Sequence, residues 1–276
     1  MLKKKKLSFL KEISIKIRKS ILETIYNAKS GHIGGSLSCA DILISLYFGK
    51  HLKFNIKKPK FESRDRLIVS KGHATAAYYS VLAHLGFIKY SELNTYCKNN
   101  TRLATHLSER VPGVEFDTGS LGHGLGIACG LAFSAKVDKK KYKVFALISD
   151  GELYEGSVWE ALLFASHHKL NNLTIIVDRN KQIVMDKTED CIKIDPLKKK
   201  LTAFGYKVHE INGHSFIDLD KIFMKIKSKK SSVPNIVIAN TIKGKGISFM
   251  EKNLKWHHAV PQKEEFEKAM EELSQQ

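Results

Sequence analysis

Three runs of consecutive apolar residues constrain the fold of this chain most strongly. They occupy residues 143–149 (KVFALIS), 173–178 (LTIIVD) and 236–242 (IVIANTI). A strand covered on one face alternates polar and apolar residues, whereas a strand buried on both faces is apolar throughout. The runs therefore predict an α/β fold, with a doubly wound, mostly parallel sheet and helices on both of its faces.

Weaker patterns add further elements to this sheet. Residues 66–70 (RLIVS) and 206–211 predict two more strands, and a glycine-containing loop is expected at residues 31–35. The predicted helices lie at residues 7–28, 41–48, 74–85, 131–135 and 153–170, of which the last has the length of a crossover between parallel strands. No internal repeat or Pro-rich linker divides the chain, so residues 1–276 are predicted to form one domain.

The composition is that of a globular protein in a reducing compartment. Hydrophobic residues make up 43% and charged residues 27% of the 276 residues, which excludes a disordered or fibrous chain. No stretch reaches the roughly 18 apolar residues that a membrane span needs. The four cysteines include no Cys-x-x-Cys pair, which argues against a disulfide framework and a structural zinc site. We therefore expect a cytoplasmic protein without a membrane partner.

The formal net charge of +18 comes almost entirely from lysine, because only six of the 46 basic residues are arginines. Proteins that bind nucleic acids more often use arginine forks for phosphates and base edges, and aromatic platforms for single strands. We therefore expect no nucleic-acid partner. A lysine-rich surface would instead steer anionic sugar phosphates towards a cleft.

The sharpest local feature is a set of polar residues after two of the apolar runs: Asp150 and Gly151 after the first, Asn180 after the second. In an open α/β sheet, ligands bind outside the carboxyl ends of the strands, where these residues would converge. One carboxylate and one amide oxygen suit a hard cation, and a glycine lets the backbone approach a phosphate. The pattern indicates a magnesium–diphosphate site, although Asp-Gly after a strand is also a common turn.

The segment from Asp150 to Asn180 resembles the cofactor motif of thiamine-diphosphate-dependent enzymes. That motif begins Gly-Asp-Gly and ends Asn-Asn or Asp-Asn, whereas this chain has Ser149 and Arg179 at the two outer positions; both departures spare the expected metal ligands. Five more segments resemble transketolase motifs in the same order: residues 30–35 (SGHIGG), 70–74 (SKGHA), 105–106 (TH), 119–124 (GSLGHG) and 256–261 (WHHAVP). Together these motifs cover nearly the whole chain.

The resemblance to transketolase implies a role for each matched residue. The ligands of Mg²⁺, or of Ca²⁺ or Mn²⁺ in its place, would be Asp150, Asn180 and the carbonyl of Gln182. Thiamine diphosphate would be contacted by His73, Gly119, Ser120, Leu121, Asp150, Gly151, Glu155, Asn180 and His257, with Glu155 joining a carboxylate network at a subunit interface. The catalytic and substrate-channel residues would be His32, His73, His106 and His257, because imidazole moves protons and hydrogen-bonds sugar hydroxyls near neutral pH.

The similarity ends where the diphosphate-binding domain of transketolase ends, so we expect the pyrimidine-binding and C-terminal domains on another chain. The resemblance implies the N-terminal subunit of a split transketolase that transfers a two-carbon ketol group from a ketose phosphate to an aldose phosphate, as in the pentose phosphate pathway. It would be active only with a separate C-terminal subunit, in an α2β2 assembly. The alternatives are a subunit of another thiamine-diphosphate transferase or synthase acting on a different sugar or 2-oxo acid, and a cationic binding protein without catalysis.

Two further positions depart from the transketolase motifs, and two glycine-containing segments resemble other binding loops. His123 stands where transketolases more often have Gln, and His258 replaces a small Gly beside His257. The glycines at residues 122–130 resemble a dinucleotide loop, but they do not follow a strand and the spacing fails. Residues 243–246 (KGKG) lack the spacing of a P-loop and are interpreted as a strand-exit loop that could lie near a phosphate.

Overall fold

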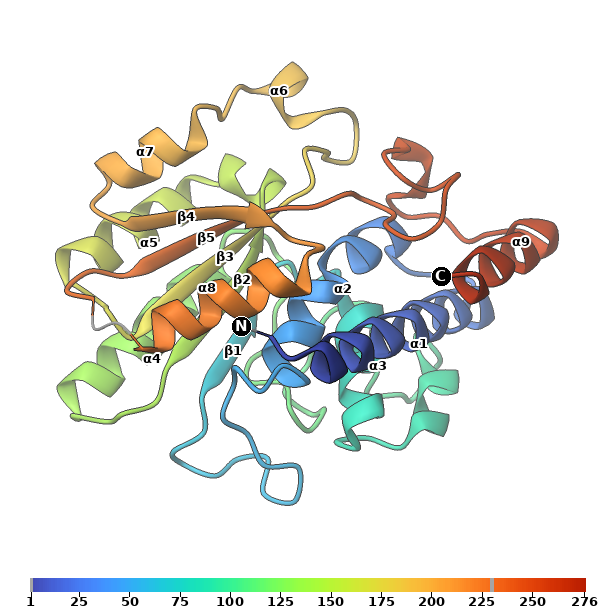
Figure 1. Cartoon of the computed structure of the whole chain (residues 1–276), viewed down its shortest axis with the longest axis horizontal. Helices are drawn as coiled ribbons and strands as arrows, with labels where there is room; N and C mark the ends of the chain where they lie inside the picture. Colours follow the sequence, from blue (N-terminus) through green and yellow to red (C-terminus); the bar gives the residue numbers. More distant parts are fainter. Residues whose placement is uncertain (1, 229–230) are drawn as a thin grey trace.

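A five-stranded parallel sheet forms the centre of the protein in the computed structural model, which describes residues 2–228 and 231–276 (Figure 1). The strands are β1 (Arg66–Val69), β2 (Val144–Ser149), β3 (Leu173–Arg179), β4 (Lys207–Asn212) and β5 (Asn235–Asn240). Their order is β1-β2-β3-β5-β4, and each neighbouring pair is parallel. The predicted α/β class and all five predicted strands are confirmed.

Helices cover both faces of this sheet (Figure 1). One face carries α4 (Gly124–Val137), α5 (Gly156–His167) and α7 (Leu197–Ala203). The other carries α2 (Ile33–Tyr47), α3 (Thr75–Leu85) and α8 (Phe216–Ser228). Farther from the sheet, α1 (Lys4–Ala28) packs on α2 and α3, and α9 (Lys263–Ser274) packs on α1. Shorter elements are α6 (Thr188–Cys191) and the 3₁₀ helices η1 (Tyr90–Thr95), η2 (Gly151–Tyr154) and η3 (Leu254–Trp256). None of the helices within the described residues is long and apolar enough to cross a membrane.

The continuous apolar runs arise because the strands contribute side chains to the hydrophobic cores on both faces of the sheet. In β2, Phe145 and Leu147 belong to the cluster beneath α1, α2 and α3, while Ala146 and Ile148 belong to the cluster beneath α4 and α5. Side chains alternate along a strand, so a strand buried on both faces must be apolar at every position. The doubly wound sheet follows directly from this pattern.

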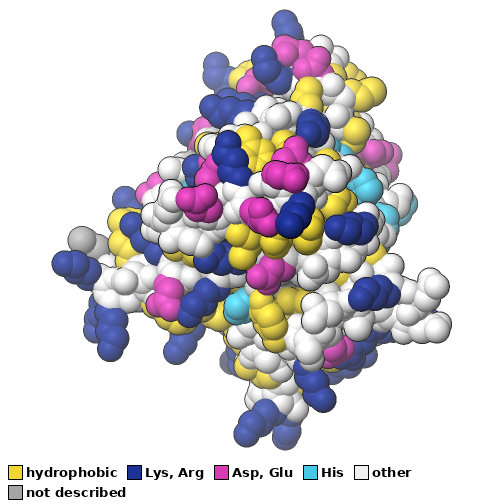
Figure 2. All heavy atoms as spheres, turned by 90° about the vertical axis from the view of Figure 1, so that its right-hand side faces the viewer, with side chains coloured by type: hydrophobic (Ala, Val, Ile, Leu, Met, Phe, Trp, Pro, Cys, Tyr) yellow, Lys and Arg dark blue, Asp and Glu magenta, His cyan; other side chains and the backbone are white. Residues whose placement is uncertain are grey.

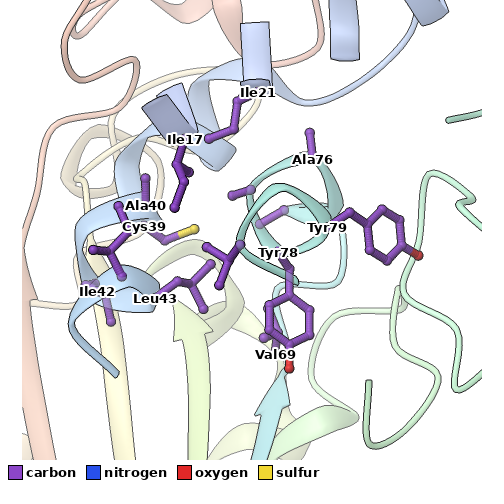
Figure 3. Packing of buried hydrophobic residues seen from close by; sticks show 14 of the residues in the cluster. Ile17, Ile21, Cys39, Ala40, Ile42, Leu43, Val69, Ala76, Tyr78 and Tyr79 are labelled. Atoms are coloured by element: carbon purple, nitrogen blue, oxygen red, sulfur yellow. The ribbon is translucent and has the colours of Figure 1, made fainter. Parts of the chain in front are cut away.

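The larger core continues away from the sheet into a helical layer. Ile17 and Ile21 of α1 lie against α2 and α3, and Leu43 of α2 and Tyr78 of α3 fill the space between those helices and β1 (Figure 3). This packing fixes the position of α2, whose first turn reaches the carboxyl ends of the strands.

Helix α2 begins earlier than the sequence predicts. Gly34 and Gly35 lie in its first turn, and only the beginning of the predicted loop at residues 31–35 is outside the helix. A Cβ on Gly34 would lie 2.6 Å from the carbonyl oxygen of Trp256, and a Cβ on Gly35 would lie 3.3 Å from Nε2 of His73. These glycines therefore allow close packing between segments rather than a turn.

Helix α4 also begins earlier, at Gly124 instead of near residue 131. Glycine lowers helix propensity by about 1 kcal/mol relative to alanine, which is why a glycine-rich stretch predicts a loop. Packing decides otherwise, because a Cβ on Gly124 would lie 2.4 Å from Oγ of Ser70 at the end of β1. The helix can approach the sheet this closely only with glycine there.

Candidate active site

The carboxyl ends of β2 and β3 hold the predicted metal-binding residues close together. Asp150 is fully buried; its Oδ1 accepts a hydrogen bond from the Gly151 amide at 2.9 Å and its Oδ2 one from the Lys181 amide at 2.6 Å. Asn180 is also buried, and its Oδ1 accepts a hydrogen bond from the Gln182 amide at 3.1 Å. Both side chains are thus held by the backbone of the loops that follow their strands.

A cavity of about 200 Å³ opens beside these two loops. The predicted site residues that line it are His73, Leu121, Gly151, Glu155, Asn180, Gln182 and His257. Asp150 lies next to it, behind Gly151, and a Cβ on Gly151 would lie 2.8 Å from Cγ2 of Ile183. The cavity therefore depends on a residue without a side chain at position 151.

The predicted histidines form one group at the edge of this cavity. The ring of His32 lies 5.2 Å from that of His73 and 5.4 Å from that of His257, measured between centroids. His106 is tied to the same region by Gly119, since a Cβ there would lie 2.9 Å from the imidazole. On the face shown in Figure 2, histidine side chains lie close together near one edge. Ser120 is exposed, and no contact places its side chain in the cavity.

The imidazoles of His32, His73 and His257 are neutral at pH 7. Burial, followed by repulsion from His258, His257 and His106, lowers the pKa of His32 to about 3. Burial and then the Lys243 ammonium lower the pKa of His257 to about 4. The pKa of His73 is also well below its ordinary value, because of burial and then the nearby Lys71. Nδ1 of His32 is buried and has no hydrogen-bond partner in the described part of the chain. Each ring can therefore accept a hydrogen bond as well as donate one.

The surroundings of Asp150 disfavour the ionised form of its carboxyl group. Burial and then repulsion from Asp178 raise its pKa to about 6, against the opposing effect of the Lys181 amide and the Arg179 guanidinium. A bound divalent cation would stabilise the ionised form of such a group. The chemistry of the site thus fits a metal ion at Asp150.

Two buried lysines that the sequence motifs did not single out as site residues also reach the cavity. Lys71 forms an ion pair with Asp178 and donates a hydrogen bond to the Gly35 carbonyl at 3.0 Å. Burial alone would lower the pKa of Lys71, but Asp178 raises it above its ordinary value. Lys71 could have been predicted as a site residue from the sequence, because it lies inside the motif at residues 70–74.

Lys243 has no acidic partner at hydrogen-bond distance among the described residues. Its Nζ donates to the Ile183 carbonyl at 2.9 Å and to Nδ1 of His257 at 2.8 Å, and lies 3.4 Å from the Gln182 carbonyl. Burial and then repulsion from Lys71 lower its pKa to about 8. A buried ammonium whose hydrogen-bond partners are all neutral fits an anionic ligand. The sequence feature that points to Lys243 is its position in the strand-exit loop at residues 243–246.

Glu152 is a further buried carboxylate that sequence reasoning missed. Its Oε1 accepts hydrogen bonds from the Gly122 amide, at 2.9 Å, and from the Ser70 hydroxyl, and its Oε2 accepts one from the Ser149 amide at 3.2 Å. One side chain thereby ties together the ends of β1 and β2 and the loop that contains Gly119 and Leu121. Nothing local in the sequence distinguishes Glu152 from a turn residue.

The donor set around Asp150 fits a magnesium ion that takes its remaining ligands from a diphosphate. No group of three or more His, Cys, Asp or Glu side chains converges as a metal site in residues 2–228 and 231–276. The expected ligands Asp150, Asn180 and the carbonyl of Gln182 contain only one carboxylate, as is usual for Mg²⁺ sites completed by phosphate oxygens. The buried Oε1 of Gln182 has no hydrogen-bond partner among the described residues, so the side chain of this proposed ligand residue has one oxygen unused.

Sequence comparison finds relatives along almost the whole chain. Residues 10–275 match the family described as "Transketolase, thiamine diphosphate binding domain". The chain is 42% identical over 262 residues to an apulose-4-phosphate transketolase subunit of Phocaeicola vulgatus, covering 95% of this chain and 92% of that protein. It is 36% identical over 263 residues to a 6-deoxy-6-sulfo-D-fructose transketolase subunit of a Clostridium species, covering 94% of each chain.

Full-length transketolases match over less than half of their own length. Human transketolase is 37% identical over 272 residues, which are 98% of this chain and 43% of the human protein. The crystal structure of transketolase from Campylobacter jejuni superposes with a TM-score of 0.90 at 33% identity, covering 97% of this chain and 43% of that one. The similarity is therefore to one portion of those enzymes.

Proposed function

The chain belongs to the family of transketolase thiamine-diphosphate-binding domains, and from this premise we propose that it is the N-terminal, cofactor-binding subunit of a split transketolase. With a separate C-terminal subunit it would transfer a two-carbon ketol group from a ketose phosphate to an aldose phosphate. Two relatives that are named as transketolase subunits support this proposal, because they align over 92% and 94% of their length.

The observation that carries the proposal is the convergence of oxygen donors and buried cations on one cavity. Asp150, Asn180 and the Gln182 carbonyl would hold Mg²⁺ in this proposal. Lys243, together with the neutral rings of His73 and His257, would bind the diphosphate, and the missing side chain at residue 151 would let the backbone approach it. Thiamine diphosphate, when bound, supplies the electron sink for breaking the carbon–carbon bond of the sugar.

The histidines would serve the sugar rather than the cofactor alone. His32 lies beside the cavity-lining rings of His73 and His257, and His106 lies beside the Gly119 backbone, where imidazoles can hydrogen-bond sugar hydroxyls and move a proton between oxygen atoms. The low pKa of His32 means that the ring stays neutral near pH 7. His32 would therefore act mainly by hydrogen bonding and positioning, with His106, whose ring is beside the Gly119 backbone, completing the channel.

A partner subunit would close the open side of the site. Glu155 is exposed at the cavity, as a residue of an interface carboxylate network would be before assembly. Val184 and Met185 also line the cavity and are 62% and 77% exposed. Large apolar side chains at the rim of a polar site favour coverage by another protein surface. We propose an α2β2 assembly in which the C-terminal subunit contributes the pyrimidine-binding half of the site.

The sugar substrates of this chain need not be those of the pentose phosphate pathway. The relatives named above act, by their names, on apulose 4-phosphate and on 6-deoxy-6-sulfo-D-fructose. In this chain the exposed ring of His258 lies 4.4 Å from the ring of His32, where transketolases more often have glycine. A narrower channel beside His32 favours the alternative that the enzyme acts on another anionic ketose.

The deciding experiment measures ketol transfer by the chain alone and mixed with a candidate C-terminal transketolase subunit from the same source. The assay contains thiamine diphosphate, Mg²⁺, ribose 5-phosphate and one donor: xylulose 5-phosphate, apulose 4-phosphate or 6-deoxy-6-sulfo-D-fructose. We expect activity in the mixture only, and the preferred donor identifies the substrate. Activity of the chain alone would contradict the need for a partner, and failure to bind thiamine diphosphate would contradict the proposed function.

Replacing His32 or His106 by alanine should raise KM for the donor or acceptor sugar about tenfold or more, which corresponds to the loss of one hydrogen bond to substrate. The affinity for thiamine diphosphate should change much less, because neither ring contacts the proposed metal ligands. Steady-state kinetics of the assembled enzyme and calorimetry of cofactor binding measure the two effects. His209→Ala, on β4 and away from the cavity, is the control. A larger loss in cofactor affinity than in KM would contradict the channel role.

A further inference from the structure

Arg179 is a buried guanidinium with an unusual number of partners. It is the last residue of β3, and its side chain is 2% exposed. One nitrogen, Nη1, lies 3.3 Å from Oδ2 of Asp150 and 3.0 Å from Oγ1 of Thr188. The other, Nη2, donates to Oε1 of Glu189 at 2.8 Å and to Oδ2 of Asp195 at 3.1 Å. One side chain thus joins three carboxylates and a hydroxyl.

Apart from Asp150, these partners all belong to residues 183–195, which we call the cover segment. Its first residues, Ile183, Val184 and Met185, line the cavity beside Asn180. Val184, Met185 and Ile192 are 62%, 77% and 63% exposed, whereas Ile194, near the end of the segment, is buried in the core cluster beneath α4 and α5. Between Ile183 and Ile194, polar contacts such as the Arg179 cluster therefore contribute most to holding the segment.

The geometry explains why a guanidinium is needed at this position. Its planar fork can donate to several acceptors at once, and charge-assisted hydrogen bonds of this kind are stronger than neutral ones. Without the cation, Glu189 and Asp195 would face each other and Asp150 with no compensating charge. An apolar residue at position 179 would therefore release the cover segment and leave Asp150 without its only charged hydrogen-bond partner in the described chain.

We propose that Arg179 is a positioning residue that holds the cover segment and the Asp150 carboxylate in one arrangement, so that the loop over the cavity and the metal-binding oxygen are set by the same side chain. The consequence for metal binding rests on the proposed function of Asp150. The contacts by which Arg179 holds the cover segment to β3 do not depend on the proposed function, because they form in the chain without any ligand.

The first test measures hydrogen–deuterium exchange by mass spectrometry in the full chain, comparing Arg179→Leu with the wild type. Amides that report on the segment include those of Ile183 and Thr188, which donate to Asp186 and Lys181 at 2.9 and 3.1 Å. We expect their exchange to become at least about tenfold faster, since local opening controls exchange. Methylguanidinium, added below denaturing concentrations, should restore part of the protection.

The control is Arg64→Leu, which removes a partly buried arginine elsewhere in the chain that also pairs with a carboxylate. Arg64 pairs with Glu115 at 2.6 Å, and the two side chains are 15% and 12% exposed, but neither touches the cover segment. This variant should leave exchange in residues 183–195 unchanged. Unchanged exchange in Arg179→Leu, or the same acceleration in both variants, would overturn the proposal.

The second test measures Mn²⁺ binding in the presence of thiamine diphosphate, by the electron paramagnetic resonance signal of free Mn²⁺. We expect Arg179→Leu to raise the Mn²⁺ Kd by about 10- to 100-fold, as loss of a group that orients a metal ligand commonly does. An unchanged Kd would overturn the link to Asp150. If the wild-type chain mixed with the C-terminal subunit bound no Mn²⁺ in the presence of the cofactor, the proposed function would be contradicted. The exchange data would still show whether Arg179 holds the cover segment.

Discussion

Replacing Asp150 by alanine should abolish magnesium-dependent binding of thiamine diphosphate, with an affinity loss of at least about 100-fold, or roughly 3 kcal/mol. Asp150 is the one carboxylate in the proposed ligand set, and its burial means that no water-exposed group can replace it. Asp150→Asn separates shape from charge, because the amide fills the same space without the negative charge. In the Asp150→Asn variant, the affinity for thiamine diphosphate should also lose most of its dependence on Mg²⁺.

Isothermal titration calorimetry with and without Mg²⁺ measures this effect, and circular dichroism shows whether the fold is retained. A suitable control is Asp220→Asn, since Asp220 is another partly buried carboxylate, which accepts a hydrogen bond from the Lys6 ammonium at 3.1 Å but lies on α8. The control should bind the cofactor as the wild type does. If Asp150→Ala bound thiamine diphosphate with unchanged affinity in the presence of Mg²⁺, Asp150 would not be a ligand of the metal ion.

Replacing Lys71 by methionine should destabilise the fold by about 3–5 kcal/mol, the usual cost of leaving one partner of a buried ion pair unpaired. Lys71 and Asp178 are both fully buried. Burial alone would raise the pKa of Asp178, and Lys71 is the main reason why it stays below its ordinary value. Without Lys71, the hydroxyls of Ser38 and Thr241 would remain as its hydrogen-bond donors.

Urea unfolding of three variants tests this pair. Lys71→Met alone should cost the most, and Lys71→Met combined with Asp178→Asn should recover part of the loss, because the second change removes the uncompensated charge. Asp178→Asn alone leaves the Lys71 ammonium buried without its carboxylate partner, and its free energy of unfolding measures the cost of that change. If Lys71→Met cost less than about 1 kcal/mol, the ion pair would be unimportant for stability.

The sheet could be predicted from sequence because the property that places its strands is local. Continuous apolar residues such as those at 143–149 and 173–178 follow from burial on two faces, and no distant information is needed. The starts of α2 and α4 could not be predicted in the same way. Whether Gly34 or Gly124 lies in a loop or in a helix depends on Trp256 and Ser70, which are distant in the sequence.

The predicted site residues were found through motifs, and the missed ones share a different property. Lys71, Glu152, Arg179 and Lys243 acquire their importance from partners that only the folded chain brings close. Arg179, for example, is a departure from a motif in the sequence, but in the structure it joins Asp150 to a segment that begins several residues later. Buried charges of this kind cannot be distinguished from surface charges in a chain with 46 basic residues.

The close contact between Gly34 and the Trp256 carbonyl restricts how this site can change during evolution. With 2.6 Å between a Cβ at residue 34 and that oxygen, the backbone that leads to His257 has no room to shift towards α2. Insertions there would break the contact, whereas an exchange of the His258 side chain, which packs against the ring of His32 and not against Gly34, would not. New substrate preferences in this lineage should therefore arise by single substitutions along a fixed backbone path rather than by remodelled loops.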